Sequence, residues 1–355
     1  MMDAVSTAAR LGPCAIRVRG TGSSHEQLLR ELEPGKDEAS PDLEIEVGPS
    51  LDFDAYQPRV YSAKQNLNFS ADRFFRADPL AHLVGSWTGE GPCSARVSCP
   101  EPLRGLRRLQ PDFTLMTYRV FWGLMHFVLA RRQAAFLHAG VASADGEGIA
   151  FVGTGGCGKT SLLFSLLEDP SHRYLAEDFA IVDRAGRTWS SNKCVSIYAS
   201  DTRIPMLARY LRGALTLRQR LLWARRSRRG NPRIKALPGD ILGDRIAPSA
   251  QLGRVFYLIR TEQSAVEISP ATPAALAERA TLVACRELRT WMETLQMIAA
   301  NDVIECVFPT PAEAAEQLRA LYCQAFAHAE THLVRVPRHC PPADLLQALR
   351  QDGRL

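Results

Sequence analysis

The amino-acid sequence predicts an α/β protein, with a mixed-sheet domain over residues 111–355 and a β-rich N-terminal domain over residues 1–110. Three observations support this fold class. Short strand patterns separated by turn-forming residues fill the N-terminal region. An apolar strand pattern leads through a glycine-rich turn into a helical pattern near residue 160. Helical periodicity then dominates the chain from residue 273 onward.

The composition is that of a globular chain. Its 355 residues are 46% apolar, enough for two ordinary domains or for one large domain with an appendage. The nine cysteines form no CxxC pair and no spacing typical of metal ligands, and the N-terminal MMDAVSTAARLG lacks an apolar core. We therefore expect reduced thiols and a cytoplasmic protein. The longest apolar run, VFWGLMHFVLA, is too short to span a bilayer, so no membrane span is expected.

The order of the remaining elements follows from periodicity. The stretch 111–132 repeats apolar side chains at helical spacing with Pro111 in its first turn, and a domain boundary is expected just before it. The N-terminal domain shows no visible chemistry, and only its position suggests a role in acceptor recognition. Strands are expected at 14–20, 42–48, 82–87, 94–99 and 331–337, and further helices at 273–301, 311–330 and 341–351.

The segment GTGGCGKT, residues 153–160, matches the phosphate-loop pattern G-x-x-x-x-G-K-[ST] between a strand pattern and a helix pattern. Glycines let the backbone approach an anion closely, and the following helix N-terminus adds positive potential. Lys159 is expected to reach the β- and γ-phosphates, and the Thr160 hydroxyl to bind Mg²⁺. The alternative is a glycine-rich turn that binds nothing. The expected nucleotide-binding residues are Gly153, Thr154, Gly155, Gly156, Cys157, Gly158, Lys159, Thr160 and Ser161.

The segments flanking the loop narrow the class of protein. Upstream, the strand pattern 134–143 and the strand entering the loop are joined by an Asp-Gly turn, which predicts a hairpin with an antiparallel neighbour. Downstream, a buried strand is expected over 174–182, followed by a turn and a further strand. Glu177 and Asp178 interrupt it, and carboxylates in an apolar strand are costly unless a cation or a reacting proton satisfies them. They are candidates for the Mg²⁺ ligand and the general base; the alternative is a strand end whose acids face solvent or pair with nearby arginines.

A guanine-specific nucleotide site is disfavoured. The stretch SNKC, residues 191–194, contains Asn-Lys, but Val195 stands where an aspartate would contact guanine. A GTP-dependent switch protein is therefore not expected.

The hairpin containing LHAG, the phosphate loop and the acidic pair together resemble HPr kinase/phosphorylase and its relatives, over about residues 133–185. The resemblance implies a mixed-sheet P-loop domain with a nucleotide site like that of phosphoenolpyruvate carboxykinases, ATP and Mg²⁺ as cofactors, and a homo-oligomer. It places His138 near the phosphates, where the alternative is a core histidine. It also suggests Glu177 as base and Asp178 on Mg²⁺, although Glu177 stands where the family has aspartate.

Two features of that family have no counterpart here. The N-terminal domain shows no likeness to the family's sensor domain, and no segment after Trp189 matches the one that supplies a further acidic metal ligand. Phosphorolysis and HPr itself as a substrate are therefore doubtful. The chain is more like related kinases that act on other hydroxyl groups.

The sequence thus predicts an ATP- and Mg²⁺-dependent kinase whose acceptor is a hydroxyl of a protein, peptide or small molecule, with Lys159, His138, Glu177 and Asp178 as catalytic residues. The alternative is a nucleotide-binding regulator that transfers no phosphoryl group. The basic insertion 209–235 has ten Arg or Lys residues and no acid. It is either a solvated, partly mobile loop or a surface for an acidic acceptor. Nucleic acid is disfavoured because aromatic interleaving and known motifs are lacking.

Overall fold

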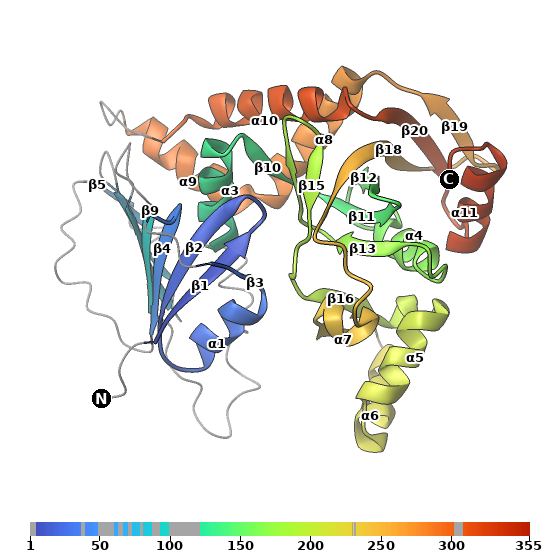
Figure 1. Cartoon of the computed structure of the whole chain (residues 1–355), viewed down its shortest axis with the longest axis horizontal. Helices are drawn as coiled ribbons and strands as arrows, with labels where there is room; N and C mark the ends of the chain where they lie inside the picture. Colours follow the sequence, from blue (N-terminus) through green and yellow to red (C-terminus); the bar gives the residue numbers. More distant parts are fainter. Residues whose placement is uncertain are drawn as a thin grey trace. The chain divides into compact units, whose positions relative to one another are not determined.

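The chain divides into two compact units (Figure 1). The first combines Met1–Ala135 with Ala284–Leu318, and the second combines Phe136–Val283 with Arg319–Leu355. The computed structural model describes residues 5–36, 40–48, 60–62, 67–69, 73–78, 81–86, 93–98, 121–228, 230, 232–301 and 308–355.

The division between the units differs from the expected boundary at residues 110/111, because aromatic packing draws a later segment into the first unit. Helix α3 (Trp122–Arg131) packs against helix α9 (Arg289–Ala300). The Phe127 ring lies 6.1 Å from that of Trp291 and 5.3 Å from that of Phe308. Of the helix expected at 111–132, the residues before 121 lie outside the described part.

The first unit contains a mixed sheet in the order β3-β1-β2-β4-β9-β8-β7-β6-β5. Strands β2, β4 and β9 are parallel neighbours, whereas the other pairs are antiparallel. The expected N-terminal strands are confirmed. The elements are β1 (Val5–Leu11), β2 (Cys14–Gly20), α1 (Ser23–Arg30), β3 (Glu33–Pro34), β4 (Leu43–Gly48), β5 (Val60–Ser62), β6 (Leu67–Phe69), β7 (Arg73–Asp78), β8 (Ala81–Ser86) and β9 (Cys93–Ser98).

The sheet of the second unit runs in the order β10-β14-β15-β18-β12-β11-β13, with β20 pairing β18 and β19 pairing β20. Its strands are β10 (Ala134–Leu137), β11 (Ala139–Ala144), β12 (Glu147–Gly153), β13 (Arg173–Ala176), β14 (Ala180–Asp183), β15 (Arg187–Trp189), β18 (Ser249–Thr261), β19 (Glu267–Pro270) and β20 (Glu330–Pro337). The remaining elements are α4 (Lys159–Leu166), β16 (Val195–Tyr198), η2 (Ala199–Arg203), α5 (Pro205–Ala214), α6 (Leu217–Ser227), β17 (Arg233–Ala236), α7 (Pro238–Leu242), α8 (Pro273–Glu287), α10 (Pro311–Phe326) and α11 (Pro342–Gln351).

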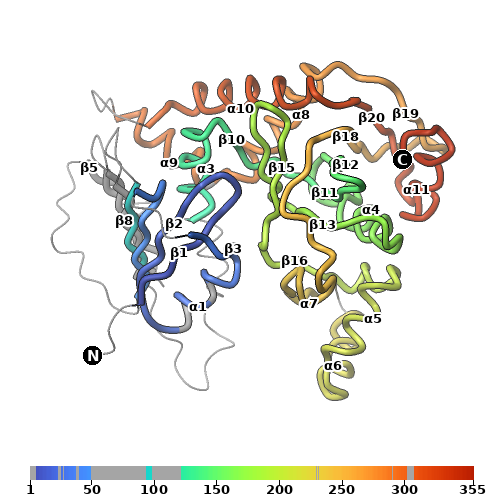
Figure 2. Tube along the Cα trace, in the orientation of Figure 1, coloured from blue at the N-terminus to red at the C-terminus, as the bar shows by residue number. Residues whose placement is uncertain are grey.

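Strand β12 has one antiparallel and one parallel neighbour. It forms the expected hairpin with β11, in which Ala144 pairs with Glu147 next to the turn, and it runs parallel to β18, which in turn runs parallel to β20. Figure 2 follows the chain from β11 through β12 into α4. The mixed sheets and the helices confirm the α/β class.

The strand expected over 174–182 is two strands. It breaks between Ala176 and Ala180, where Asp178 has a φ of 69° and the Phe179 N–H donates to the Glu177 carbonyl. β13 pairs with β11, whereas β14 neighbours β10. A positive φ is costly for a residue other than glycine and is found at turns and functional sites. The acidic pair therefore lies on a turn between strands and not within a strand.

Helix α4 is buried against the sheet and against α11. The four leucines that the helical pattern placed in a core are fully buried: Leu162, Leu163, Leu166 and Leu167. They join a core that includes leucines of α11. Within the described ranges, no helix is both long and apolar enough to cross a membrane.

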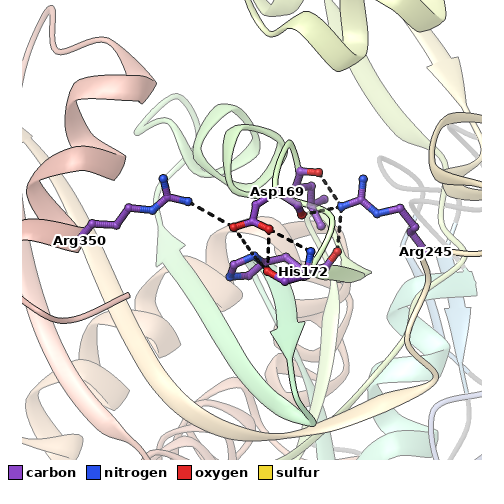
Figure 3. Close-up of polar contacts among 6 residues, drawn as sticks. Asp169, His172, Arg245 and Arg350 are labelled. Atoms are coloured by element: carbon purple, nitrogen blue, oxygen red, sulfur yellow. Dashed lines mark hydrogen bonds and ion pairs between the residues drawn. The ribbon is translucent and has the colours of Figure 1, made fainter.

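A cluster of polar contacts holds the C-terminal end of α4 (Figure 3). The Arg245 Nη2 donates to the carbonyl oxygens of Leu167, Asp169 and His172, at 2.7, 2.8 and 2.9 Å. The Asp169 carboxylate lies 3.8 Å from the Arg350 guanidinium of α11 and 3.8 Å from His172 Nδ1. Carbonyls at a helix end need donors, and Arg245 supplies them here.

Replacing Arg245 by alanine is expected to lower the free energy of unfolding by about 2–4 kcal/mol, because three hydrogen bonds to partly buried carbonyls would be lost. Urea titration followed by circular dichroism measures this change. The control is Arg335→Ala, which removes only an exposed ion pair with Glu267 and should change stability by less than about 1 kcal/mol. Equal losses of unfolding free energy in the two variants would contradict the role of Arg245 as a donor to these carbonyls.

Candidate functional site

The phosphate loop, residues 153–158, connects β12 to α4 and leaves open space above Gly155 and Gly156. Gly156 and Gly158 have φ values of 79° and 104°, which glycine adopts readily. A Cβ at Gly155 or Gly156 would meet nothing within 4 Å, whereas a Cβ at Gly153 would lie 2.7 Å from the Leu258 carbonyl oxygen. The loop is thus fixed at its start and open at its middle, as a backbone cradle for an anion requires.

Lys159 is buried beneath this loop, at 6% exposure. Its Nζ donates to the carbonyl oxygens of Gly153 and Thr154, at 2.9 and 3.0 Å, and lies 3.0 Å from His138 Nε2. The Cys157 sulfur lies 4.0 Å from the same Nζ. The structure therefore brings together Lys159 and His138, two candidate residues separated by 21 positions in the sequence.

His138 is neutral in this setting. Burial, followed by the Lys159 charge, lowers the pKa of His138 to about 4. Because the Lys159 ammonium can only donate, Nε2 must accept, which assigns the ring proton to Nδ1. His138 thus stands at the break between β10 and β11 as a partner that orients the Lys159 amine.

The two acids of the turn point to different partners. Glu177 Oε1 accepts a 2.6 Å hydrogen bond from the Thr160 hydroxyl, at the first turn of α4. Asp178 Oδ2 lies 3.0 Å from Lys193 Nζ, and that ammonium stands 4.7 Å from the centre of the Phe179 ring. The Glu177 carboxylate therefore contacts Thr160, just after the phosphate loop, whereas the Asp178 carboxylate contacts Lys193.

These surroundings shift the two carboxyl groups in opposite directions. Burial, and next the Asp178 charge, raises the pKa of Glu177. Burial would also raise the pKa of Asp178, but the Lys193 ammonium lowers it, and the net shift is downward. Glu177 is 5% exposed, whereas the Asp178 side chain is 30% exposed. Asp178 is therefore the carboxylate that a second molecule can reach.

Ser161, expected among the nucleotide-binding residues, is engaged elsewhere. Its hydroxyl hydrogen-bonds the Asp201 carboxylate of η2, and Asp201 Oδ2 also accepts from the Tyr198 N–H at 2.8 Å. This contact ties the first turn of α4 to the segment that follows β16.

Sequence reasoning missed Lys193 and Asp201. Lys193 is the only charged residue in SSNKCVSIYA, residues 190–199, yet it is 5% exposed. A lone cation in an uncharged stretch that also contains β16 is a weak indication of a buried ion pair. The contact with Asp178 could not be found from local sequence, because it joins two turns.

The donor set fits Mg²⁺ bound together with a nucleotide. Among the described residues, no group of three or more His, Cys, Asp or Glu side chains is arranged to hold a metal by itself. Mg²⁺ commonly takes only one or two protein oxygens and completes its shell with phosphates and water. The Thr160 hydroxyl and Glu177 supply such oxygens, and Glu177 Oε2 is buried without a hydrogen-bond partner in the described part of the chain.

The basic insertion 209–235, expected as a solvated loop between helical pieces, is itself largely helical, and most of its described residues are exposed. It contributes most of α5, all of α6 and the first three residues of β17, and α6 has no buried residue. Leu217 and Leu221 are 72% and 66% exposed on α6. A shallow hollow between α5 and α7 is lined by Met206, Arg209, Tyr210, Gly213, Ala214, Asp240 and Ile241.

No protein-family model matches this chain, and no curated protein matches it either.

Proposed function

We propose that the protein is an ATP- and Mg²⁺-dependent kinase that transfers the γ-phosphoryl group to a hydroxyl of a protein, peptide or small molecule. The hydrogen bond between Thr160 and Glu177 is the observation that carries this proposal, because it joins the phosphate loop to the acidic turn. A buried carboxylate is costly unless a partner satisfies it, and Glu177 Oε2 has no hydrogen-bond partner among the described residues.

The geometry favours an exchange of the roles that the resemblance suggests for the acids. Glu177, beside Thr160, would hold Mg²⁺, and Asp178, the more exposed acid, would accept the proton of the acceptor hydroxyl. When bound, Mg²⁺ would neutralise charge on the phosphate oxygens. The acceptor oxygen then bonds to the γ-phosphorus as the bond to the ADP oxygen breaks, and its proton passes to Asp178.

The chain's cations support the same reaction. Lys159 would turn from the loop carbonyls to the β- and γ-phosphates, a short movement because its amine already lies inside the loop. Lys193 holds Asp178 deprotonated and oriented. Positioning and charge stabilisation of this kind supply most of the rate enhancement in phosphoryl transfer.

The test is transfer from γ-labelled ATP to small-molecule extracts and to peptides, analysed by intact mass with and without Mg²⁺. The proposal expects a product that gains one phosphoryl group only when Mg²⁺ is present. Binding of ATP without transfer of label to any acceptor or to water would contradict it.

A nucleotide-binding regulator is the second candidate, and the ion pair between Asp178 and Lys193 favours it, because that pair occupies the proposed base. The regulator predicts partner binding that depends on ATP while the γ-phosphate remains intact. A kinase without its acceptor should instead hydrolyse ATP slowly and respond to the right acceptor.

The outer face of α6 is the proposed site for an acidic acceptor. Replacing Arg218 and Arg225 together by glutamate should raise the acceptor concentration for half-maximal transfer by about tenfold or more, because two attractions become repulsions. The KM for ATP should not change. The control is Arg184→Glu, which reverses one exposed arginine instead of two, in the turn between β14 and β15. An equal effect of this control would show that only net charge matters.

A further inference from the structure

The carboxyl ends of three parallel strands meet beside the phosphate loop. Gly153, the last residue of β12, pairs with Leu258 of β18, and Arg260 of β18 pairs with Val336 of β20. Ligands of open α/β sheets bind at the carboxyl ends of such strands. Arg260 therefore lies two residues beyond the strand position that faces the start of the loop.

The Arg260 guanidinium is anchored on one side only. Its Nη1 donates to the Pro337 carbonyl at 2.6 Å and approaches the carbonyls of Arg338 and Cys340 at 3.5 Å each. Its Nη2 stands 2.9 Å from the position that a Cβ at Gly158 would take. Throughout the described part of the chain, no hydrogen-bond acceptor is found for Nη2.

We propose that Arg260 contacts a phosphate of the bound nucleotide, as a second cation of the loop besides Lys159. This inference rests on the proposed function for the identity of the ligand. Gly158 is the N-cap of α4, so Nη2 lies next to the helix end at which phosphates bind. A guanidinium already fixed by carbonyls at Nη1 loses little freedom when Nη2 donates to an anion.

A purely structural role makes a different prediction. If Arg260 only tied β18 to the residues after β20, its removal would lower stability and leave nucleotide affinity unchanged. Two of its features go beyond that role: the direction of Nη2 toward the loop and the glycine at residue 158 that leaves room for it.

Isothermal titration calorimetry of the full chain tests the proposal, with ATP, ADP and adenosine as probes. Arg260→Met should weaken ATP and ADP binding by about tenfold or more, since a charge-assisted hydrogen bond is lost, and should leave adenosine binding unchanged. Arg260→Lys keeps a donor for Pro337 but lacks the second nitrogen, so it should also weaken ATP binding and remain folded if the methionine variant does not. The matched control, Arg254→Met, removes an arginine of the same strand that contacts Glu147 and the Arg354 carbonyl, and it should bind ATP like the wild type.

The outcomes separate this proposal from the function on which it rests. Wild-type ATP affinity in both Arg260 variants overturns the phosphate contact alone, and so does an equal loss for adenosine and ATP. Absence of ATP binding by the wild-type protein overturns both. ATP binding that depends on Arg260, with no transfer to any acceptor, supports the contact and overturns the kinase.

Discussion

Replacing Lys159 by alanine should reduce phosphoryl transfer by at least about a thousandfold, because the loop would lose the cation that meets the β- and γ-phosphates. Transfer of label from γ-labelled ATP measures the loss. The substitution also removes the donor for Gly153 O, Thr154 O and His138 Nε2, so we expect a decrease of about 1–3 kcal/mol in the free energy of unfolding. Lys36→Ala, an exposed lysine of the first unit, is the control.

His138 gives an independent measure of the same substitution. The charge of Lys159 is the second cause, after burial, of the low pKa of His138. Removing that charge should raise the pKa of His138 above about 4 but leave it below the ordinary histidine value, since burial remains. NMR titration of the imidazole would show this shift. Full transfer activity in the alanine variant, or an unchanged His138 pKa, would contradict the proposed arrangement.

Replacing Asp178 by asparagine should lower phosphoryl transfer by about 10²- to 10⁴-fold, the range typical of a lost general base. Asparagine is almost the same size and still offers Lys193 an oxygen acceptor, so the turn should keep its shape. ATP binding should therefore persist, and the loss should appear in kcat rather than in the KM for ATP. Single-turnover transfer and ATP titration together measure both quantities.

Two further variants test the division of roles between the acids. Glu177→Gln should raise the Mg²⁺ concentration that half-maximal phosphoryl transfer requires, because Glu177 lies beside Thr160. Asp178→Asn should leave that concentration unchanged. Asp183→Asn is the control, since the Asp183 carboxylate accepts from the N–H of Arg187, at the start of β15, and has no contact with the loop among the described residues. If the magnesium response changed in Asp178→Asn alone, the assignment of roles that the resemblance suggested would be the better one.

Turn residues and apolar periodicity predicted those helices and hairpins whose formation depends on neighbouring residues. The hairpin before the loop, helix α4 and the terminal helix α11 depend on turn residues and periodicity within a few positions, and they are where the sequence indicates. The helix expected at 273–301 is instead two helices, α8 and α9, and the helix expected at 311–330 ends at Phe326, before β20 begins at Glu330. The acidic turn was misjudged, because apolar residues on both sides of Glu177 and Asp178 look like one strand. Only pairing with two different neighbours, β11 and β10, shows that the chain bends there.

The candidate site was predictable only in part for the same reason. The loop and the acidic pair carry recognisable patterns, and the resemblance added His138. Lys193, Asp201 and Arg260 reach the site through contacts across the sheet or between turns, which no local pattern records. Arg260 in particular looks like an ordinary strand arginine until the register of β18 against β12 is known.

The first unit is discontinuous, and this has a consequence for how the protein is made. Its aromatic cluster is incomplete until Trp291 and Phe308 have been synthesised, although most of the unit ends at Ala135. About 150 residues of the other unit emerge from the ribosome in between, which takes on the order of ten seconds. During that time Phe127 of α3 lacks the rings of Trp291 and Phe308, and any fragment expressed as this unit alone needs residues 284–318 joined to it.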